Sequence, residues 1–584
     1  MEDSLAANRN SAGRPSESTS TMKAPLPSLW WTPLLIIGAS AFAVEIPFFF
    51  KGMPSGHDVE FHLYSWLEVL SQWKIGIWYP RWAAMAHFGY GEPRFIFYPP
   101  ASWTLGALLS AIFPWTLAAS VYLWLVLTAN GASMFLLARR WFNRRDAIFV
   151  AALYAVNPYH LVIVYWRSAF AELLAGCLLP LLLLCLLKAA EDNNGWRMTI
   201  PLGAVMAGAW LTNAPAAVMI HYSLGLLILL LAWRQRSPRL LAVGATAMIL
   251  GACLAAFYLL PAIYEQKWVT IAEAVSAGSR PLDNFLFVHT SDVDHDRFNR
   301  IVSWLAVAEM AAILAAAWAA KQWSNRENSA TNSSIAANPA RNNLSRIWSG
   351  LAIWAVACSI LMFPVTGLLW NTLPKLRFMQ FPWRWMLCLS MIFCLLLTAG
   401  VRRWWLRIAV VAAMLLVIAY SWQRIQTPWW DNAGDLHEMQ DNIDDAGYEG
   451  TDEYTPAGAE PSVVDKDARR VTVDGPEHAA IRVLQWNARS KVFAAELSAP
   501  SHLALHLFNY PAWQVMVNGH VVEATMRAGT GQMLVPVQQG INRVQITFIR
   551  TGDRTAGAWI SALTFIVTLL IRLFPRQPIR QRAA

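Results

Sequence analysis

Apolar residues in this chain come in long unbroken blocks separated by short polar stretches, and not at the spacing of an amphipathic helix. A block of about 20 apolar residues is long enough to cross a bilayer as a helix. The blocks predict about twelve spans, near residues 31–50, 117–138, 147–165, 169–187, 198–214, 216–233, 240–262, 301–320, 347–366, 384–401, 405–421 and 557–574. The expected fold is therefore mainly α, a polytopic transmembrane helical bundle.

The apolar stretch "PPASWTLGALLSAIFPW" (99–115) does not fit this count. As a full span it would put the basic cluster "ARRWFNRR" outside and reverse every later loop, so we expect a juxtamembrane or re-entrant helix on the outer side. The first block has no small-residue cleavage site behind it and is typical of an uncleaved signal anchor. The polar, Ser-rich residues 1–29 before it are expected to be cytoplasmic and disordered.

The chain is 56% hydrophobic and only 14% charged, with a net charge of +9. Its basic residues lie in short clusters between the apolar blocks, where the positive-inside rule expects cytoplasmic loops. This pattern argues against a nucleic-acid partner and predicts a multi-pass protein of the inner (plasma) membrane with both termini in the cytoplasm. All six cysteines lie inside apolar blocks, which indicates buried thiols and not a disulfide framework.

The pattern changes in the segment 422–556, where the apolar blocks stop and strand-like alternation begins. "HLALHLFNY", "WQVMVNGHVVEATM" and "GQMLVPVQQGINRVQITFI" predict a small extracytoplasmic, β-sandwich-like domain. Asn518-Gly519 predicts a hairpin, and "QQGINRV" a second turn.

The predicted domains are a transmembrane module at 30–421 with a first outer loop at 51–98, the β domain at 422–556, and a final helix with a basic cytoplasmic tail at 557–584. We expect the β domain to act as a lid or scaffold for the membrane module, with an independent carbohydrate-binding module as the alternative. The low-complexity residues 325–343 predict a cytoplasmic linker.

The first outer loop opens with "GHDVEFHLYSW" (56–66), directly after the first apolar block. Asp58 and His62 are four residues apart, so on a helix they share one face, and His57 adjoins them. A solvated interfacial helix would explain these charges without any function. However, ionisable groups at membrane level are costly and tend to be functional, which favours a site here.

Several motifs occur in a fixed order along the chain: "GHDxxFH", "YPRW" (79–82), "FGYGEPRFIFYPP" (88–100), "VYWRSAFAELLAG" (164–176), "LPKLRFMQFPWRW" (373–385), "DEYTPAG" (452–458) and "NYPAWQVMVNGHVV" (509–522). In this combination the sequence resembles bacterial polytopic membrane proteins of the GT-C glycosyltransferase superfamily. The nearest relatives are YfhO-like, and some carry the label pyruvoyl-tetrahydropterin-synthase-related. A pterin synthase needs a metal-binding His cluster in a soluble fold, which this sequence does not offer.

The resemblance implies inverting transfer of a sugar from a polyprenyl-phosphate donor to a glycan, lipid or protein acceptor on the outer face of the bilayer. It also implies Asp58 as the catalytic base. The departing phosphate needs a cation, for which arginine suits best because its planar fork binds phosphate oxygens in pairs. The outer-face arginines are Arg81, Arg94, Arg167, Arg377 and Arg384.

Further candidates for substrate contact are His57, His62, Tyr98, Glu172 and Gln380. For some residues a structural role stays open: an Arg167–Glu172 pair could pin two helix ends, and Arg384 could be an interfacial anchor among tryptophans. Glu45, inside the first span, could face the bundle or reach to the interface.

No metal site is assigned, although a divalent cation stays open as a cofactor because some superfamily members use one. His57, His62 and Asp58 make a weak ligand set. The motif "DVDHDR" (292–297) begins like a calcium loop but lacks glycine at its sixth position and glutamate at its twelfth.

Two further function classes stay open. A transporter or lipid flippase predicts charged or broken helices near the bilayer midplane, whereas here the unusual polar residues cluster at the outer ends of spans. A non-catalytic scaffold for envelope assembly would keep the fold and could lose Asp58.

Overall fold

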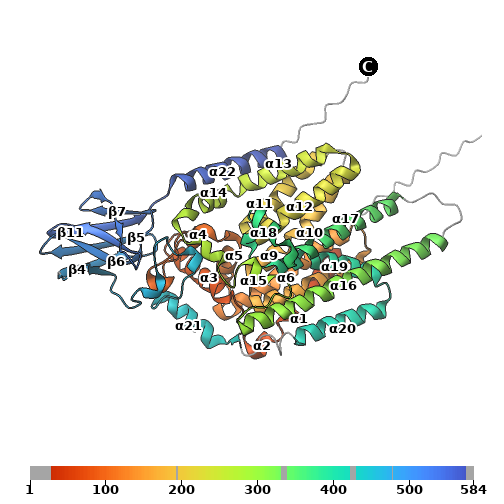
Figure 1. Ribbon diagram of the computed structural model, residues 1–584, viewed down its shortest axis with the longest axis horizontal. Helices are drawn as coiled ribbons and strands as arrows, with labels where there is room; N and C mark the ends of the chain where they lie inside the picture. Colours follow the sequence, from red (N-terminus) through yellow and green to blue (C-terminus); the bar gives the residue numbers. More distant parts are fainter. Residues whose placement is uncertain (1–27, 192–194, 331–338, 421–428, 477, 574–584) are drawn as a thin grey trace, which may run out of the picture.

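The computed structural model describes residues 28–191, 195–330, 339–420, 429–476 and 478–573. Several long helices run along the long axis of the molecule, and the strands of the two C-terminal sheets lie together at one end (Figure 1). The expected mainly α architecture with a C-terminal β region is confirmed. The predicted disordered N-terminus at 1–29, except its last two residues, lies outside the described residues. Of the predicted linker at 325–343, residues 331–338 also lie outside them, and the described remainder is helical, at the end of α16 (Val293–Ala330) and the start of α17 (Pro339–Leu361).

Eight helical segments in the described part are long and apolar enough to cross a membrane. They are Trp31–Lys51, Trp115–Ala138, Arg144–Arg167, Phe170–Glu191, Ala214–Gln235, Val293–Trp323, Pro382–Gly400 and Gly552–Leu573. Two further segments are bent pairs, Pro238–Leu254 with Ala256–Trp268 (77°) and Ser349–Leu361 with Pro364–Thr372 (89°). Counting each pair as one span gives up to ten spans.

The other two predicted spans are too short to meet this criterion. The block at 198–214 forms α11 (Thr199–Thr212), and the block at 405–421 forms α20 (Trp404–Tyr420). At 1.5 Å per residue these helices are about 21 and 26 Å long, below the roughly 30 Å of a bilayer core. Among the described residues the candidate spans therefore number eight to ten, against about twelve predicted.

The stretch at 99–115 forms the short helix α5 (Pro100–Ile112), which is also too short to span. It packs against α3 (Val59–Lys74) of the first outer loop and α6 (Trp115–Ala138). The packing is close, because a Cβ built on Gly106 would lie 2.0 Å from the Trp66 ring. A short helix outside the count of spans is what the charge pattern had predicted.

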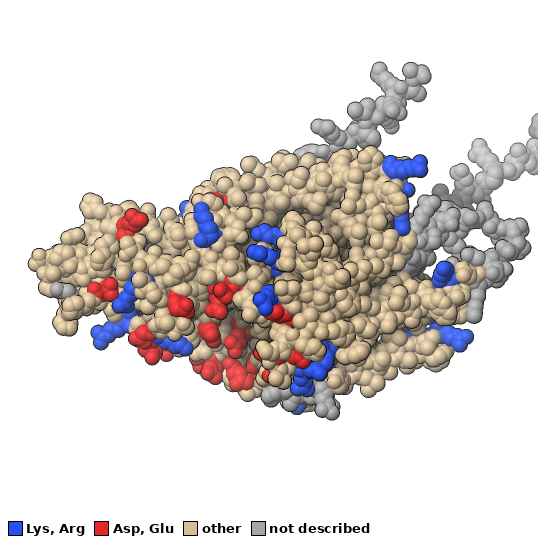
Figure 2. Space-filling view, viewed as in Figure 1, with Lys and Arg blue, Asp and Glu red and all other residues tan. Residues whose placement is uncertain are grey.

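The segment after residue 429 first covers the outer loop and only then forms the sheets. Strand β1 (Met53–Pro54) pairs with β2 (Trp430–Asp431), and α21 (Ala433–Asp444) packs against α3. Tyr448 stacks on Tyr64 with ring centroids 4.2 Å apart. Acidic side chains gather over this region, next to the β-strands (Figure 2).

Two antiparallel sheets make up the β domain between residues 471 and 548. The four-stranded sheet has the strand order β3 (Val471–Val473), β6 (Ser501–Phe508), β10 (Gln532–Val537), β9 (Thr525–Met526). The five-stranded sheet has the strand order β4 (Ala479–Trp486), β5 (Ser490–Leu497), β11 (Gly540–Phe548), β7 (Trp513–Val517), β8 (His520–Val522). The β7–β8 hairpin turns at Asn518 and Gly519, both with positive φ, as predicted. The second predicted turn leads from β10 to β11 in the other sheet, with Gly540 at φ 95°.

The β domain is attached to the membrane module by buried aromatic and charged contacts. Trp82 of the first outer loop packs against Tyr510, Trp513 and Phe548. Beyond β11, α22 (Gly552–Leu573) returns along the bundle (Figure 1). The first outer loop is therefore enclosed between the bundle, the 429–470 segment and the sheets.

Candidate functional site

Asp58 lies immediately before the first residue of α3, where its backbone is fixed by the next pair of spans. The amide of His57 donates to the carbonyl of Trp166 at 3.0 Å, and the amide of Asp58 donates to the carbonyl of Arg167 at 2.8 Å. The side chain of Asp58 is 24% exposed. The carboxylate is thus held in one place while part of it stays accessible.

Gly56 makes this docking feasible by its lack of a side chain. A Cβ there would lie 2.6 Å from both Ser168 Oγ and the carbonyl oxygen of Trp166. The hydroxyl of Ser168, a residue with φ 46°, accepts from the Gly56 amide at 3.1 Å and donates to the Pro54 carbonyl at 3.1 Å. The glycine of "GHD" is therefore needed for close approach and not for a positive φ.

Arg167 ends a π-helical turn, Ile163–Arg167, that closes the preceding span. Such turns are rare and often occur at functional sites. Arg167 Nη2 donates to Asp58 Oδ2 at 2.7 Å, while Nη1 is 3.9 Å from Glu172 Oε2. Among the described residues Nη1 has no hydrogen-bond acceptor, although it is buried. One arm of the guanidinium is thus hydrogen-bonded to Asp58, and the other faces Glu172 beyond hydrogen-bond distance.

Glu172 joins this arginine to a second one. Arg384 Nε is 3.0 Å from Glu172 Oε2, and Tyr159 donates its hydroxyl hydrogen to Glu172 Oε1 at 2.5 Å. Asp58, Arg167, Glu172 and Arg384 therefore form a row of alternating charges, which we call the charged row. Glu172 offsets the repulsion that two buried guanidinium groups would otherwise feel.

Aromatic rings support both arginines of the charged row. The guanidinium carbons of Arg167 and Arg384 each lie 4.7 Å from the centre of the Phe381 ring, and Arg167 lies 5.2 Å from the Trp383 ring. Cations over aromatic faces are attracted by the ring quadrupole. The rings therefore fix the positions of both guanidinium groups.

Gln380 forms a strained turn beside Arg384. Its φ of 64° and ψ of −60° match a γ-turn, which the 2.7 Å bond from the Phe381 amide to the Met379 carbonyl closes. Its side chain accepts from Arg384 Nη1 at 3.2 Å and donates to the Ala274 carbonyl at 2.8 Å. Gln380 thus orients Arg384.

The two histidines of the motif have different surroundings. His57 is 78% exposed, and its Nδ1 lies 2.6 Å from Asp58 Oδ1. His62 is buried and stacks on Phe170, with Tyr98 edge-on at 5.9 Å between centroids. His57 can contact solvent or substrate directly, whereas His62 and Tyr98 line the interior side of the site.

The charged neighbours control the protonation of the acid. Burial alone would raise the pKa of Asp58, but Arg167 and the adjacent histidines hold that pKa well below its usual range. Burial lowers the pKa of His62 to about 4, against the opposing pull of Asp58. Asp58 is therefore a carboxylate and His62 a neutral ring at neutral pH.

Two of the outer-face arginines lie elsewhere. Arg94 binds Glu92 at 2.5 Å, Ser65 Oγ at 3.1 Å and Thr451 Oγ1 at 3.0 Å, so it joins the first outer loop to the 429–470 segment. Arg81 lines a cavity near the opposite end of α3. Neither has a contact with the charged row in the structure.

The acids of "DVDHDR" have structural partners. Asp292 accepts from the amides of Asp294 and His295 at the start of α16 (Val293–Ala330), and Asp296 pairs with Arg300 at 2.8 Å. Within the described ranges no group of three His, Cys, Asp or Glu residues is arranged to hold a metal ion.

Glu45 is buried inside the bundle. The structure thus favours its facing inward over its reaching to the interface.

Sequence reasoning missed Tyr159, Phe381 and Trp383 as parts of the site. Phe381 and Trp383 flank a proline in "QFPWRW", and only the tertiary arrangement shows that their rings underlie the arginines. Tyr159 lies 13 residues before Glu172 and outside the quoted motifs, so nothing in the sequence around it indicated a place in the site.

One family model matches the chain over residues 95–427: the 6-pyruvoyl-tetrahydropterin synthase related domain, described as a membrane protein. The match includes Arg167, Glu172, Gln380 and Arg384, and Asp58 lies before it. No curated protein matches the sequence.

Solved structures with similarity to the chain include two membrane transferases. The arabinofuranosyltransferase AftD from Mycobacteria is 15% identical with a TM-score of 0.38, over 67% of this chain and 27% of that one. An oligosaccharyltransferase from Archaeoglobus fulgidus, tethered with an acceptor peptide, is 14% identical with a TM-score of 0.35, over 71% of this chain and 55% of that one. The chain thus spans between about a quarter and about half of their lengths, and TM-scores below 0.5 are too low to assign a function.

Proposed function

We propose that this chain, which belongs to the 6-pyruvoyl-tetrahydropterin synthase related family of membrane proteins, is a membrane glycosyltransferase. It would move a sugar from a polyprenyl-phosphate donor to a hydroxyl of a glycan, lipid or protein acceptor on the outer face, with inversion. The proposal rests on one observation: the charged row joins a partly exposed carboxylate to two arginines that lie over an aromatic ring. Three members of the row, Arg167, Glu172 and Arg384, lie at the ends of three candidate spans.

Arg167 and Arg384 are the groups suited to the donor phosphate. Arg167 has a buried Nη1 without an acceptor in the part of the chain that the structure describes. Guanidinium groups bind phosphate oxygens in pairs and keep their charge when buried. Arg167 ends one candidate span and Arg384 is the third residue of another, which supports this role because span ends would lie at the level where a lipid phosphate meets water.

Asp58 is suited to the proton of the acceptor hydroxyl. Its lowered pKa makes it a weak base, so it would take the proton only as the new glycosidic bond forms and the hydroxyl becomes acidic. In that step the acceptor oxygen bonds to the anomeric carbon and the bond from that carbon to the phosphate oxygen breaks. The electron pair leaves with the phosphate, and the proton goes to Asp58.

The remaining candidates would assist these two roles. His57, hydrogen-bonded to Asp58 and mostly exposed, would orient the carboxylate and contact the acceptor. His62 and Tyr98 would shape the sugar pocket from the interior side. The charged row holds two carboxylates and two guanidinium cations, so its net charge is zero. A divalent cation is therefore not needed to neutralise its charge before the donor binds.

We propose the same orientation as the sequence predicts, with the site and the β domain on the outer face and both termini in the cytoplasm. The sheets and the 429–470 segment would then act as a scaffold over the first outer loop.

A transporter is the second candidate, because two of the spans are bent by 77° and 89°. Bent or broken helices often bind substrate near the bilayer midplane. The charged row instead lies at span ends, which favours the transferase.

The decisive experiment compares the native protein with Asp58→Asn in detergent, using labelled polyprenyl-phosphate sugars. Loss of a general base lowers a rate by about 100-fold or more. We expect that loss of sugar transfer in Asp58→Asn, with donor binding retained. Asp445→Asn, which changes an exposed acid after α21, is the matched control. Equal turnover by Asp58→Asn would refute the base assignment, and a native protein that neither binds nor turns over such donors would refute the transferase.

A further inference from the structure

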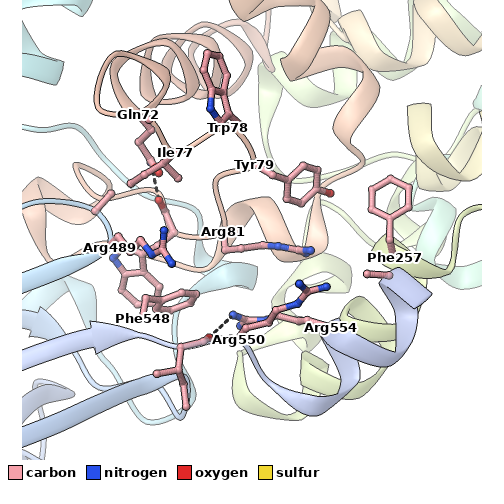
Figure 3. Close-up of a pocket in the computed structure, with 15 residues that line it drawn as sticks. Gln72, Ile77, Trp78, Tyr79, Arg81, Phe257, Arg489, Phe548, Arg550 and Arg554 are labelled. Carbon is pink, nitrogen blue, oxygen red and sulfur yellow. Dashed lines mark hydrogen bonds between the residues drawn. The ribbon is translucent and has the colours of Figure 1, made fainter. Parts of the chain in front are cut away.

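The cavity lined by Arg81 has a volume of about 400 Å³ and lies where the β domain meets the membrane module. Its walls come from the end of α3 and the following loop, from α14 (Ala256–Glu265), from the β4–β5 and post-β11 turns, and from the first turns of α22. Figure 3 shows its side chains converging from these elements. We call it the arginine cavity.

Four of the lining residues are arginines, and none is acidic: Arg81, Arg489, Arg550 and Arg554. Side chains of Arg81, Arg550 and Arg554 extend toward a common space (Figure 3). These charges repel one another: burial first, and then the nearby Arg554 and Arg550, lower the pKa of Arg81. Such a concentration of like charge is unfavourable unless an anion joins it.

Among the described residues, only Arg554 of these four arginines is in an ion pair. Arg554 binds Glu265 through two bonds of 2.7 Å, and Tyr510 also donates to that carboxylate. Arg489 and Arg550 lie in exposed turns. The cavity therefore carries an excess of positive charge.

Arg81 supplies a hydrogen-bond donor to the cavity that the described residues leave unsatisfied. Its Nη1 is buried and has no hydrogen-bond partner among the described residues, and its guanidinium lies 4.4 Å over the Tyr79 ring. Leaving a charged donor buried without an acceptor is unfavourable, because the group loses its hydration and gains no hydrogen bond in return. A phosphate oxygen in the cavity would supply the missing acceptor.

The cavity opens beside lipid-facing surface. It is lined by Arg554 and Ala558 of α22, a candidate span whose outward residues are almost all apolar and exposed. Trp78 at the cavity and Trp559 on α22 are 74% and 64% exposed, as expected for tryptophans in the interfacial belt. A ligand with a charged head and apolar chains would fit both surfaces at once.

This cavity is separate from the charged row. Asp58 precedes the first residue of α3, and Gln72 and Gly76 of the cavity lie at its other end. A helix of 16 residues is about 24 Å long. A single phosphate cannot contact both sites.

From this arrangement we propose that the arginine cavity binds the phosphate headgroup of an anionic lipid from the outer leaflet, with the lipid chains lying along α22. The inference rests on the proposed orientation in the membrane but not on the proposed transferase activity.

Binding can be measured by native mass spectrometry of the whole protein in a non-ionic detergent. The probes are phosphatidic acid, diacylglycerol with the same chains, and inorganic phosphate. Arg489→Gln/Arg550→Gln removes two exposed charges of the cavity, and Arg81→Gln removes the buried one. Arg482→Gln/Arg543→Gln, with exposed arginines on β4 and β11 outside the cavity lining, is the matched control.

We expect phosphatidic acid to bind the native protein and the control equally. Both cavity variants should bind it at least about tenfold more weakly, a change of about 1.4 kcal/mol. Arg489→Gln/Arg550→Gln keeps the test valid if Arg81→Gln fails to fold. Equal binding by the cavity variants, or binding of diacylglycerol as tight as that of phosphatidic acid, would overturn the proposal. Inorganic phosphate that binds as tightly, in an arginine-dependent way, would also overturn it and indicate a site for soluble phosphates.

Discussion

Arg167 donates a hydrogen bond of 2.7 Å to the carboxylate of Asp58, although 109 residues separate them in the chain. The backbone bonds of His57 and Asp58 to residues 166 and 167 hold the same two segments together. The acid and the cation are thus positioned before any substrate arrives. Such preorganisation is a large part of what enzymes contribute to charge stabilisation.

Replacing Arg167 should separate the contributions of charge and geometry. Arg167→Gln removes both, and we expect kcat/KM for transfer to fall by about 100- to 1000-fold, as for other lost preorganised donors. Arg167→Lys keeps the charge but loses the planar fork, so an intermediate loss is expected. Steady-state kinetics with a labelled donor measure both. Arg377→Lys, an exposed arginine in the loop before Arg384, is the control, and a loss as large as that of Arg167→Lys would argue against a specific role for Arg167.

The pH dependence of transfer follows from the lowered pKa of Asp58. A carboxylate with a lowered pKa stays ionised, and therefore able to accept a proton, as pH falls through the range where ordinary carboxyl groups titrate. His62, with a pKa of about 4, also keeps its charge state. Between pH 5 and 7 we expect no loss of kcat/KM from either group. A fall of kcat/KM as the pH is lowered from 7 to 5 would contradict this expectation.

Gly56→Ala should displace Asp58 from Arg167 although Gly56 itself has no side chain in the site. The new Cβ would meet Ser168 Oγ and the Trp166 carbonyl at 2.6 Å, which forces the "GHD" turn away from Arg167. We expect the transfer rate to fall at least tenfold and the melting temperature to fall. In Gly225→Ala, within α12 (Ala214–Gln235), a Cβ meets nothing within 4 Å, so little change is expected there. Native-like activity of Gly56→Ala would mean that the turn is not held as tightly as these contacts indicate.

Glu92 should contribute to stability through its buried ion pairs. Burial would raise its pKa, but Arg94 and His87 lower it to about 2. A pKa below the unfolded value means stabilisation that is present above about pH 4.5 and lost as pH falls through about 2; the shift corresponds to roughly 3 kcal/mol. Glu92→Gln should therefore lower the melting temperature in detergent at pH 7. Exposed Glu523→Gln is the control, and equal melting temperatures would show that Arg94 finds another partner.

The sequence indicated all four members of the charged row, and Gln380 beside it, but not their arrangement. Asp58, Arg167, Glu172, Gln380 and Arg384 each stood out as a polar residue at the end of an apolar block. Arg81 and Arg94 had the same local signal, yet the structure brings neither to the row. Local composition cannot distinguish them, because burial and partners depend on contacts with residues hundreds of positions away.

The number of spans illustrates the same limit. The apolar blocks correctly indicated a polytopic bundle, but α11 and α20 are shorter than a bilayer core and two segments bend sharply. Hydropathy measures the composition of a block, whereas the length and direction of a helix depend on the helices packed against it.

By itself the sequence determined the membrane class, the β-strand region and the hairpin turn at Asn518-Gly519, because transfer free energy, side-chain alternation and turn preference act over neighbouring residues. Only the tertiary structure decided that Arg167 and Arg384 share the Phe381 ring and Glu172, and that Arg81 joins Arg489, Arg550 and Arg554 in a separate cavity. The physical reason is that electrostatic and aromatic contacts act over a few ångströms in space, whatever the separation of the residues in the chain.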